Sequence, residues 1–320
     1  MIQINGLNKS LFGGGHTVKI LNGIDLIIPS GQFVAITGAS GSGKTTLLSL
    51  IAGLDEPTEG NIKINDQDIT KLNEDELAEL RSQHFGFIFQ NFNLIPTLTA
   101  LENVALSAEL NGTNGSKKKS MELLSLVGLA NRNHHYPSQL SGGEQQRLAL
   151  ARAFINEPSI VLADEPTGAL DPITSREVLQ LFKQLHVESD VAFLLVTHNR
   201  EVASFCERSL ELREGRFIAQ HGTDVDIGDL SDSRELIIDD TGTITLPPDV
   251  LLGLGGPGRF EMSEMDRDFL HLERVDEDKE SVSSGNNSMV LSPNCPACKY
   301  DYADSDIQLC PECGSSRPMI

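Results

Sequence analysis

Residues 33–54 read FVAITGASGSGKTTLLSLIAGL, and this stretch decides the fold. It begins with a short apolar run typical of a strand, turns through GASGSGKT at 38–45, and continues in a helical pattern from Lys44. The octet matches G-x-x-x-x-G-K-[ST], and a strand before it and a helix after it are the context that this motif requires. The alternative, a glycine-rich turn that matches by chance, leaves both flanks unexplained. We therefore predict a loop that binds the phosphates of a nucleotide.

The residue types in this loop suit that chemistry. Glycines let the backbone turn its N–H groups inward around a β-phosphate, and the N-terminus of the helix adds a partial positive charge. Lys44 is expected to reach the β- and γ-phosphates, and Thr45 is expected to offer its hydroxyl to Mg²⁺. The predicted nucleotide contacts of the loop are Gly38, Ser40, Gly41, Ser42, Gly43, Lys44, Thr45 and Thr46.

Two further apolar runs, SIVLADEP at 159–166 and VAFLLVTH at 191–198, indicate strands that are buried on both faces of a parallel sheet. Helices are expected between the strands, and the fold class is α/β with a helical insertion across about 90–150. Other strands are expected in VKILNGIDLIIP (18–29), GNIKIND (60–66) and HFGFIFQ (84–90).

Polar side chains stand where these strands end. Asp164 at the C-terminal edge of the sheet is placed to hold Mg²⁺ opposite Thr45, and Glu165 is placed to accept the proton of an attacking water. An acidic helix cap is the alternative for this pair, and the phosphate loop favours the metal and catalytic roles. His198 is expected to contact the γ-phosphate, and Gln90 to bridge Mg²⁺ and the water. The predicted catalytic residues are Glu165, His198, Gln90 and Lys44, and those around Mg²⁺ are Thr45, Gln90 and Asp164.

The sequence LSGGEQQR at 140–147 predicts a second anion-binding turn, because a serine and two glycines begin a predicted helix. A helix N-cap with a Ser-Gly-Gly turn is the simple alternative for the tripeptide alone. One domain does not need two anion-binding turns for the same phosphate group. The two turns therefore raise the question of which phosphate the second one serves.

The motifs answer this question through a resemblance. GASGSGKT, FIFQ, LSGGEQQR, VLADEPTGALD and LLVTH occur in the order seen in ABC-type ATPases, and the likeness covers about residues 1–220. Three longer stretches, GASGSGKTTLLSLIAGLDEPTEG, HFGFIFQNFNLIPTLTALENV and LADEPTGALD, resemble the macrolide-export and lipoprotein-release branch of that family most. The resemblance implies an ATPase that binds ATP and Mg²⁺ and that acts as a head-to-tail homodimer.

In such a dimer, the second turn of one copy closes over the γ-phosphate that the other copy's loop holds. By the resemblance, Asp171 crosses the dimer seam, and Phe12 lies under the adenine ring, where the family more often has tyrosine; a core role for Phe12 is the alternative. Position 144 is Glu where the family motif often has Gln. The residues assigned to the partner's nucleotide are Ser141, Gly142, Gly143 and Glu144.

The resemblance also implies a partner in the membrane. No apolar run approaches the roughly 20 residues that span a bilayer, and the N-terminus lacks the layout of a secretory signal. We expect a cytoplasmic chain, peripheral on the cytoplasmic face of the cell membrane, that drives a separate transmembrane permease subunit docked around Asn91–Leu98. The alternative is a soluble ABC-type ATPase with a regulatory or nucleic-acid-associated role.

The charge distribution separates the end of the chain from the rest. Of the net charge of −21, residues 1–222 contribute −7 and residues 223–320 contribute −14, which predicts a domain boundary near 222. An acidic surface repels phosphate backbones, so nucleic acid is an unlikely partner. Residues 232–275 alternate as strands with a turn and a short helix, and they resemble AbrB-like swapped-hairpin dimerisation domains; a generic β-rich module is the alternative.

The last segment contains four of the five cysteines. Residues 276–293 are predicted to be a disordered linker, and 294–320 resemble a zinc ribbon with the spacing C-x₂-C-x₁₁-C-x₂-C. So short a segment has no room for a core, so a structural Zn²⁺ would supply its folding energy. A redox role for the two pairs is the alternative. The predicted ligands are Cys295, Cys298, Cys310 and Cys313.

Overall fold

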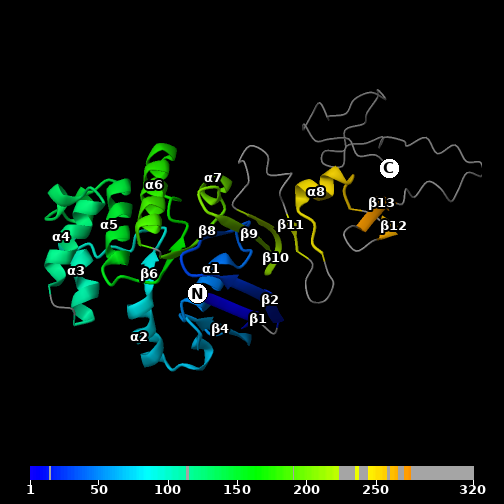
Figure 1. The fold of residues 1–320 in the computed structure, drawn as a ribbon, viewed down its shortest axis with the longest axis horizontal. Coiled ribbons are helices and arrows are strands. Elements are labelled where there is room, and N and C mark those ends of the chain that lie inside the picture. The colour runs from blue at the N-terminus through cyan, green and yellow to red at the C-terminus, as the bar shows by residue number, and fades with distance from the viewer. Residues whose placement is uncertain are drawn as a thin grey trace, which may run out of the picture. The chain divides into compact units, whose positions relative to one another are not determined.

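A seven-stranded sheet with the order β11-β10-β9-β3-β8-β7-β6 forms the centre of the computed structural model (Figure 1). Strands β9, β3, β8, β7 and β6 run parallel, and β10 and β11 continue the sheet in antiparallel fashion. The strands are β3 (Phe33–Thr37), β6 (Phe85–Ile88), β7 (Ile160–Asp164), β8 (Ala192–Thr197), β9 (Arg208–Arg213), β10 (Arg216–His221) and β11 (Glu235–Leu236). The structure describes residues 1–13, 16–112, 115–189, 191–222, 235–237, 244–257, 260–265 and 270–274.

Both faces of the parallel strands are covered, as their continuous apolar runs predict. Every residue of β8 is buried, and alternate residues of β3 enter different clusters. Val34 and Ile36 pack with one core cluster, whereas Phe33 and Ala35 pack with another. Since successive side chains of a strand point to opposite faces, the sheet separates two hydrophobic layers.

A second, antiparallel sheet closes one of these layers. Its order is β2-β1-β4-β5, and β1 pairs with β2 along almost its whole length, from Ile2 opposite Ile28 to Gly13 opposite His16. Side chains of α1 are buried between this sheet and the central one, so the helix that follows the phosphate loop is held on both sides. The strands are β1 (Ile2–Gly13), β2 (His16–Ile28), β4 (Glu59–Ile64) and β5 (Gln67–Asp68).

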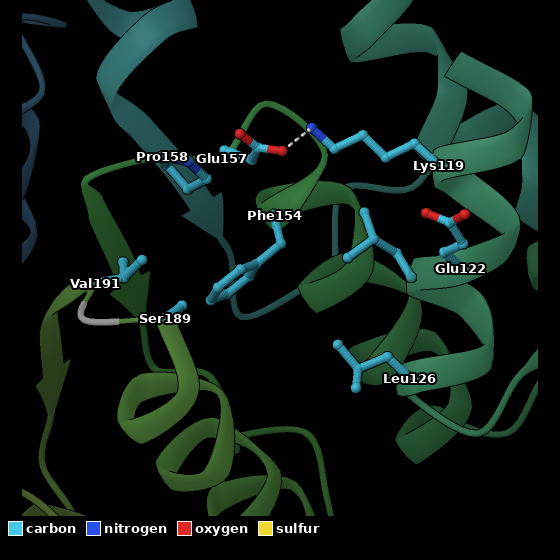
Figure 2. Close-up of a pocket in the computed structure, with 9 residues that line it drawn as sticks. Lys119, Glu122, Leu126, Phe154, Glu157, Pro158, Ser189 and Val191 are labelled. Carbon is cyan, nitrogen blue, oxygen red and sulfur yellow. Dashed lines mark ion pairs between the residues drawn. The ribbon is translucent and has the colours of Figure 1, made fainter. Parts of the chain in front are cut away.

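The other layer contains the helical part of the chain. Helices α3, α4 and α5 pack on one another at one end of the fold (Figure 1), and they fall largely within the range 90–150. A cavity of about 510 Å³ opens between α4 and the ends of α5 and α6, beside the Lys119–Glu157 ion pair of 2.7 Å (Figure 2). The helices are α1 (Lys44–Ile51), α2 (Glu74–His84), α3 (Ala100–Leu110), α4 (Ser116–Leu126), α5 (Gly142–Phe154), α6 (Pro172–Ser189) and α7 (Arg200–Ala203).

The C-terminal part contributes few described elements. β11 pairs with β10, with Ala219 opposite Leu236, so two residues of the acidic segment extend the central sheet. The chain divides into two compact units, Met1–Val250 and Leu251–Ile320. After α8 (Pro248–Gly253), β12 (Phe260–Met265) and β13 (Leu270–Arg274) form an antiparallel hairpin in the second unit.

Among the described residues of 232–275 are one strand, a short helix and a hairpin, and the module expected there stays a prediction. The boundary near 222, the likeness to AbrB and the linker stay predictions. The four cysteines of the expected zinc ribbon lie outside the described residues. Within the part of the chain that the structure describes, no helix is long and apolar enough to cross a membrane.

Candidate functional site

The phosphate loop lies between β3 and α1 and depends on its glycines. Gly38 has φ +154°, and a Cβ there would lie 2.2 Å from the carbonyl oxygen of Leu212, which is far inside contact distance. Gly43 has φ +105°, and its Cβ would lie 3.0 Å from the carbonyl oxygen of Ile20. Backbone atoms of β9 and β2 thus close around the loop. Side chains at these two positions would push it out of the shape that presents its N–H groups.

Lys44 is buried within this loop. Its ammonium donates to the carbonyl oxygens of Gly38 and Ala39, each at 2.9 Å, and only 7% of the residue is exposed. The hydroxyl of Ser42 is also buried, and no hydrogen-bond partner for it lies among the described residues. A buried ammonium and an unsatisfied hydroxyl in one loop fit an anionic ligand, because a phosphate would accept hydrogen bonds from both.

Thr45 and Asp164 meet across the sheet edge, although 119 residues separate them. The Thr45 hydroxyl donates to Asp164 Oδ1 at 3.4 Å. Burial raises the pKa of Asp164, the hydrogen bond from Thr45 lowers it, and the charge of Glu165 raises it further. A bound cation would compensate the buried charge, and a hydroxyl beside a carboxylate is an oxygen donor set that suits Mg²⁺. These two residues therefore fit the predicted ion.

Glu165 occupies a left-handed backbone conformation, with φ +45°. Its Oε1 accepts from the backbone N–H of His198 at 3.0 Å and lies 2.8 Å from His198 Nδ1, while its Oε2 accepts from the Thr197 hydroxyl at 3.1 Å. A left-handed glutamate costs about 1–2 kcal/mol, and such strain concentrates at functional sites. The structure thus brings the predicted base and the predicted histidine into direct contact.

Gln90 follows β6 and reaches the same place. A Cβ built on Gly168 would lie 3.1 Å from Gln90 Nε2 and 3.4 Å from the Glu165 carbonyl oxygen, so the amide packs over the turn that begins at Glu165. A cavity of about 200 Å³ next to this turn is lined by Glu165, Gly168 and His198, among others. Side chains that ended separate predicted strands therefore converge on one edge of the sheet.

The second turn is built as a helix cap. Ser141 Oγ accepts from the Glu144 N–H at 3.3 Å, and the Glu144 carboxylate accepts from the Ser141 N–H at 2.8 Å, which completes a capping box at the start of α5. The Ser141 N–H is the main cause that lowers the pKa of Glu144, and Arg132 also donates to this carboxylate at 3.1 Å. The glutamate at position 144 therefore stabilises the helix end, and Ser141 itself is exposed.

The two remaining predicted contacts lie at the surface. Asp171 caps α6, accepting from the N–H groups of Ile173 at 3.0 Å and Thr174 at 3.1 Å. Phe12 lies opposite Thr17, one residue before the end of β1, and is 78% exposed, so it is not part of the described core. The sequence interpretation missed Thr197, whose position directly before His198 was the available signal, and Arg132, for which no motif existed.

These features define the class of the protein: an α/β nucleotide-binding protein with a phosphate loop, acidic residues and a histidine at one sheet edge. The sequence profile of the family described as ABC transporter matches residues 21–168. The chain is 47% identical over 221 residues to the ABC transporter ATP-binding protein YtrE of Bacillus subtilis. The matched region covers 67% of this chain and 96% of that protein. The chain therefore belongs to the ATP-binding proteins of the ABC transporter family, whose members hydrolyse ATP.

Other relatives are longer. The macrolide export ATP-binding/permease protein MacB of Rhodopirellula baltica is 46% identical over 241 residues, which are 73% of this chain and 35% of that protein. The chain thus spans about a third of the length of the macrolide export relatives it matches. Among solved structures, the dimeric post-hydrolysis state of the ATP-binding cassette MJ0796 bound to ADP and Pi shares 40% identity and a TM-score of 0.65, covering 71% of this chain and 100% of that one.

Proposed function

We propose that this chain is the ATP-binding and hydrolysing subunit of an ABC transporter of the export or lipoprotein-release type. It works as a head-to-tail homodimer that closes on two ATP molecules and drives a separate membrane subunit. The observation that carries the proposal is the contact of Glu165 with His198 beside the Thr45–Asp164 pair, at the edge of the sheet that presents the phosphate loop. Relatives named as export ATP-binding/permease proteins support the transport role.

Within one copy, the loop residues bind the phosphates, and Lys44 neutralises their charge. Thr45 and Asp164 would hold Mg²⁺, together with Gln90, and the ion would neutralise charge on the phosphate oxygens as a Lewis acid. The structural support is the oxygen donor pair at 3.4 Å and the amide of Gln90 packed over the adjacent turn. The protein's contribution here is positioning and charge, because phosphoryl transfer needs little covalent chemistry from it.

Glu165 accepts the proton of the attacking water. His198 orients the Glu165 carboxylate and contacts the γ-phosphate. Three donors from Thr197 and His198 hold the Glu165 carboxylate. A general base needs a free lone pair within hydrogen-bond reach of the proton it abstracts. These donors use three of about four acceptor sites of the carboxylate, so one site on Oε2 is left to accept the proton of the water.

The second copy completes each site. Ser141, Gly142 and Gly143 of one copy face the γ-phosphate held by the other, while Asp171 crosses the seam and Phe12 lies under adenine. Ser141 is exposed at the N-terminus of a 13-residue helix, where free N–H groups and the helix dipole attract an anion. Phe12 is also exposed, so its ring is accessible to a base. The solved structures of the related cassette MJ0796 are dimeric, which supports a dimer for this chain as well.

The membrane subunit docks around Asn91–Leu98, which places the chain on the cytoplasmic face of the membrane. In the C-terminal part, Cys295, Cys298, Cys310 and Cys313 bind a structural Zn²⁺, and 232–275 form an AbrB-like dimerisation module. The support for the zinc site is the spacing of the cysteine pairs in the sequence, which suits four thiolates around one ion.

The decisive experiment is Glu165→Gln. The amide keeps the size of the carboxylate but accepts no proton, so we expect hydrolysis to fall by about a hundredfold or more. Light scattering after size exclusion should then show an ATP-dependent dimer that the normal chain does not accumulate. Glu188→Gln, on the exposed face of α6, is the matched control and should hydrolyse normally. Normal turnover by Glu165→Gln would refute the assignment of the base.

A further inference from the structure

The loop that follows Gln90 has an unusual backbone. Phe92 and Asn93 are consecutive non-glycine residues in the left-handed region, with φ +61° and φ +47°. The Phe92 N–H donates to the Phe89 carbonyl oxygen at 3.0 Å, so the chain reverses directly beside Gln90. Two adjacent left-handed side-chain residues are unfavourable on their own, so other parts of the protein must hold them in place.

Arg152 provides that hold from a different element. It projects from the last turn of α5, the helix that begins with the Ser141 cap, and its guanidinium reaches both unusual residues. Nη2 donates to the Phe92 carbonyl oxygen at 2.8 Å, and Nη1 donates to the Asn93 carbonyl oxygen. The planar fork of arginine spans two acceptors at once, which a lysine at this position would not do.

Asn103 holds the other end of the same loop from α3. This residue is 1% exposed; its Oδ1 accepts from the Ile95 N–H at 2.8 Å, and its Nδ2 donates to three carbonyl oxygens. The loop between β6 and α3 is thus attached at both ends to the helical layer. Gln90 is the residue at which it joins the sheet edge.

We propose that Arg152 is a positioning residue for ATP hydrolysis, which acts by holding Gln90 in register with α5. The chain of contacts runs from the capped start of α5 through Arg152 to the carbonyls of 92 and 93, and from there to the Gln90 amide over Gly168, next to Glu165. The inference rests on the proposed roles of Gln90 and Glu165. It predicts that Arg152 affects the rate of the chemical step and not the binding of nucleotide to the loop of the same copy.

The first test is Arg152→Ala in the full chain. We expect kcat for ATP hydrolysis to fall about tenfold or more, while KM and the affinity for a fluorescent ATP analogue stay within about twofold. Arg152→Lys keeps the charge but loses the planar fork, so its kcat should lie between those of the normal chain and Arg152→Ala. This variant provides the test if the alanine variant does not fold. An equal loss of affinity and rate, or a normal kcat, would overturn the proposal.

Arg81→Ala is the matched control. Arg81 also donates from its guanidinium to a backbone carbonyl, that of Gly53 at 2.7 Å, so this contact attaches α2 to the chain after α1 and not to the loop after Gln90. Its loss should lower the melting temperature to a similar extent while kcat stays within about twofold of normal. If both variants lose kcat together with stability, Arg152 has only a structural role.

A double-mutant cycle with Gln90→Ala separates the inference from the proposed function. If Arg152 acts through Gln90, adding Arg152→Ala to Gln90→Ala should change kcat by less than about twofold. Fully multiplicative losses would refute the coupling while leaving the role of Gln90 intact. A normal kcat for Gln90→Ala alone would instead refute the proposed function of Gln90.

Discussion

Gly143, the second glycine of the LSGG turn, offers a sharp test of how α5 and α6 fit together. A Cβ on Gly143 would lie 2.4 Å from Thr174 Cγ2, whereas ordinary contacts are 3.4–4 Å. Thr174 has little freedom to move, because its N–H donates to the Asp171 cap at 3.1 Å. Gly143→Ala should therefore displace the first turn of α6, together with Asp171, from the start of α5.

The magnitude follows from two opposing effects. Inserting a methyl group into a tight contact costs about 2 kcal/mol, and replacing glycine by alanine within a helix returns up to about 1 kcal/mol. We expect a net loss of about 1–2 kcal/mol in the free energy of unfolding. Thr174→Ser removes the clashing methyl and leaves Thr174 Cβ, at 3.8 Å, as the next contact on that side chain. The double variant should therefore return to within about 0.5 kcal/mol of the normal chain.

Urea unfolding followed by far-ultraviolet circular dichroism measures these changes, because the chain contains no tryptophan. A double variant that remains as unstable as Gly143→Ala would refute the steric argument. The ATPase rates then test function separately from stability. If the double variant is stable but inactive, Gly143 is needed for close approach to phosphate; if activity returns with stability, the glycine serves only the packing of the two helices.

The remaining predictions concern charge and metal. Burial raises the pKa of Asp164, so its carboxylate destabilises the ligand-free fold at neutral pH, and this cost disappears as the pH falls and the group binds its proton. Asp164→Asn should therefore raise the melting temperature at pH 7, lose that advantage below about pH 4, and abolish Mg²⁺-dependent hydrolysis; an equal advantage at both pH values would contradict the cause. Cys295→Ser should lower the zinc content of the purified chain, measured by atomic absorption, without changing ATP binding, and an unchanged content would refute the four-thiolate site.

The strands and helices around the site follow closely from local patterns. β7 and β8 lie where the continuous apolar runs predicted them, and α1 begins at Lys44 as expected. β1 was not predicted, and the reason is visible in its pairing with β2. Register shifts between Ile4 and Ser10 interrupt the alternation of apolar and polar residues that marks a strand in sequence. The strand is recognisable from its pairing with β2 and β4, and both of these strands lie farther along the chain.

The sequence by itself determined which chemical groups this protein has, because each motif is a short run with its own local geometry. The glycine loop, the carboxylates after β7 and the capped start of α5 belong to this group. Only the tertiary structure decided how they are joined: the Thr45–Asp164 pair across 119 residues, and the Arg152 contacts with Phe92 and Asn93 across about 60. Such contacts depend on the packing of sheet and helices, which places distant segments side by side and leaves no periodic trace in either segment.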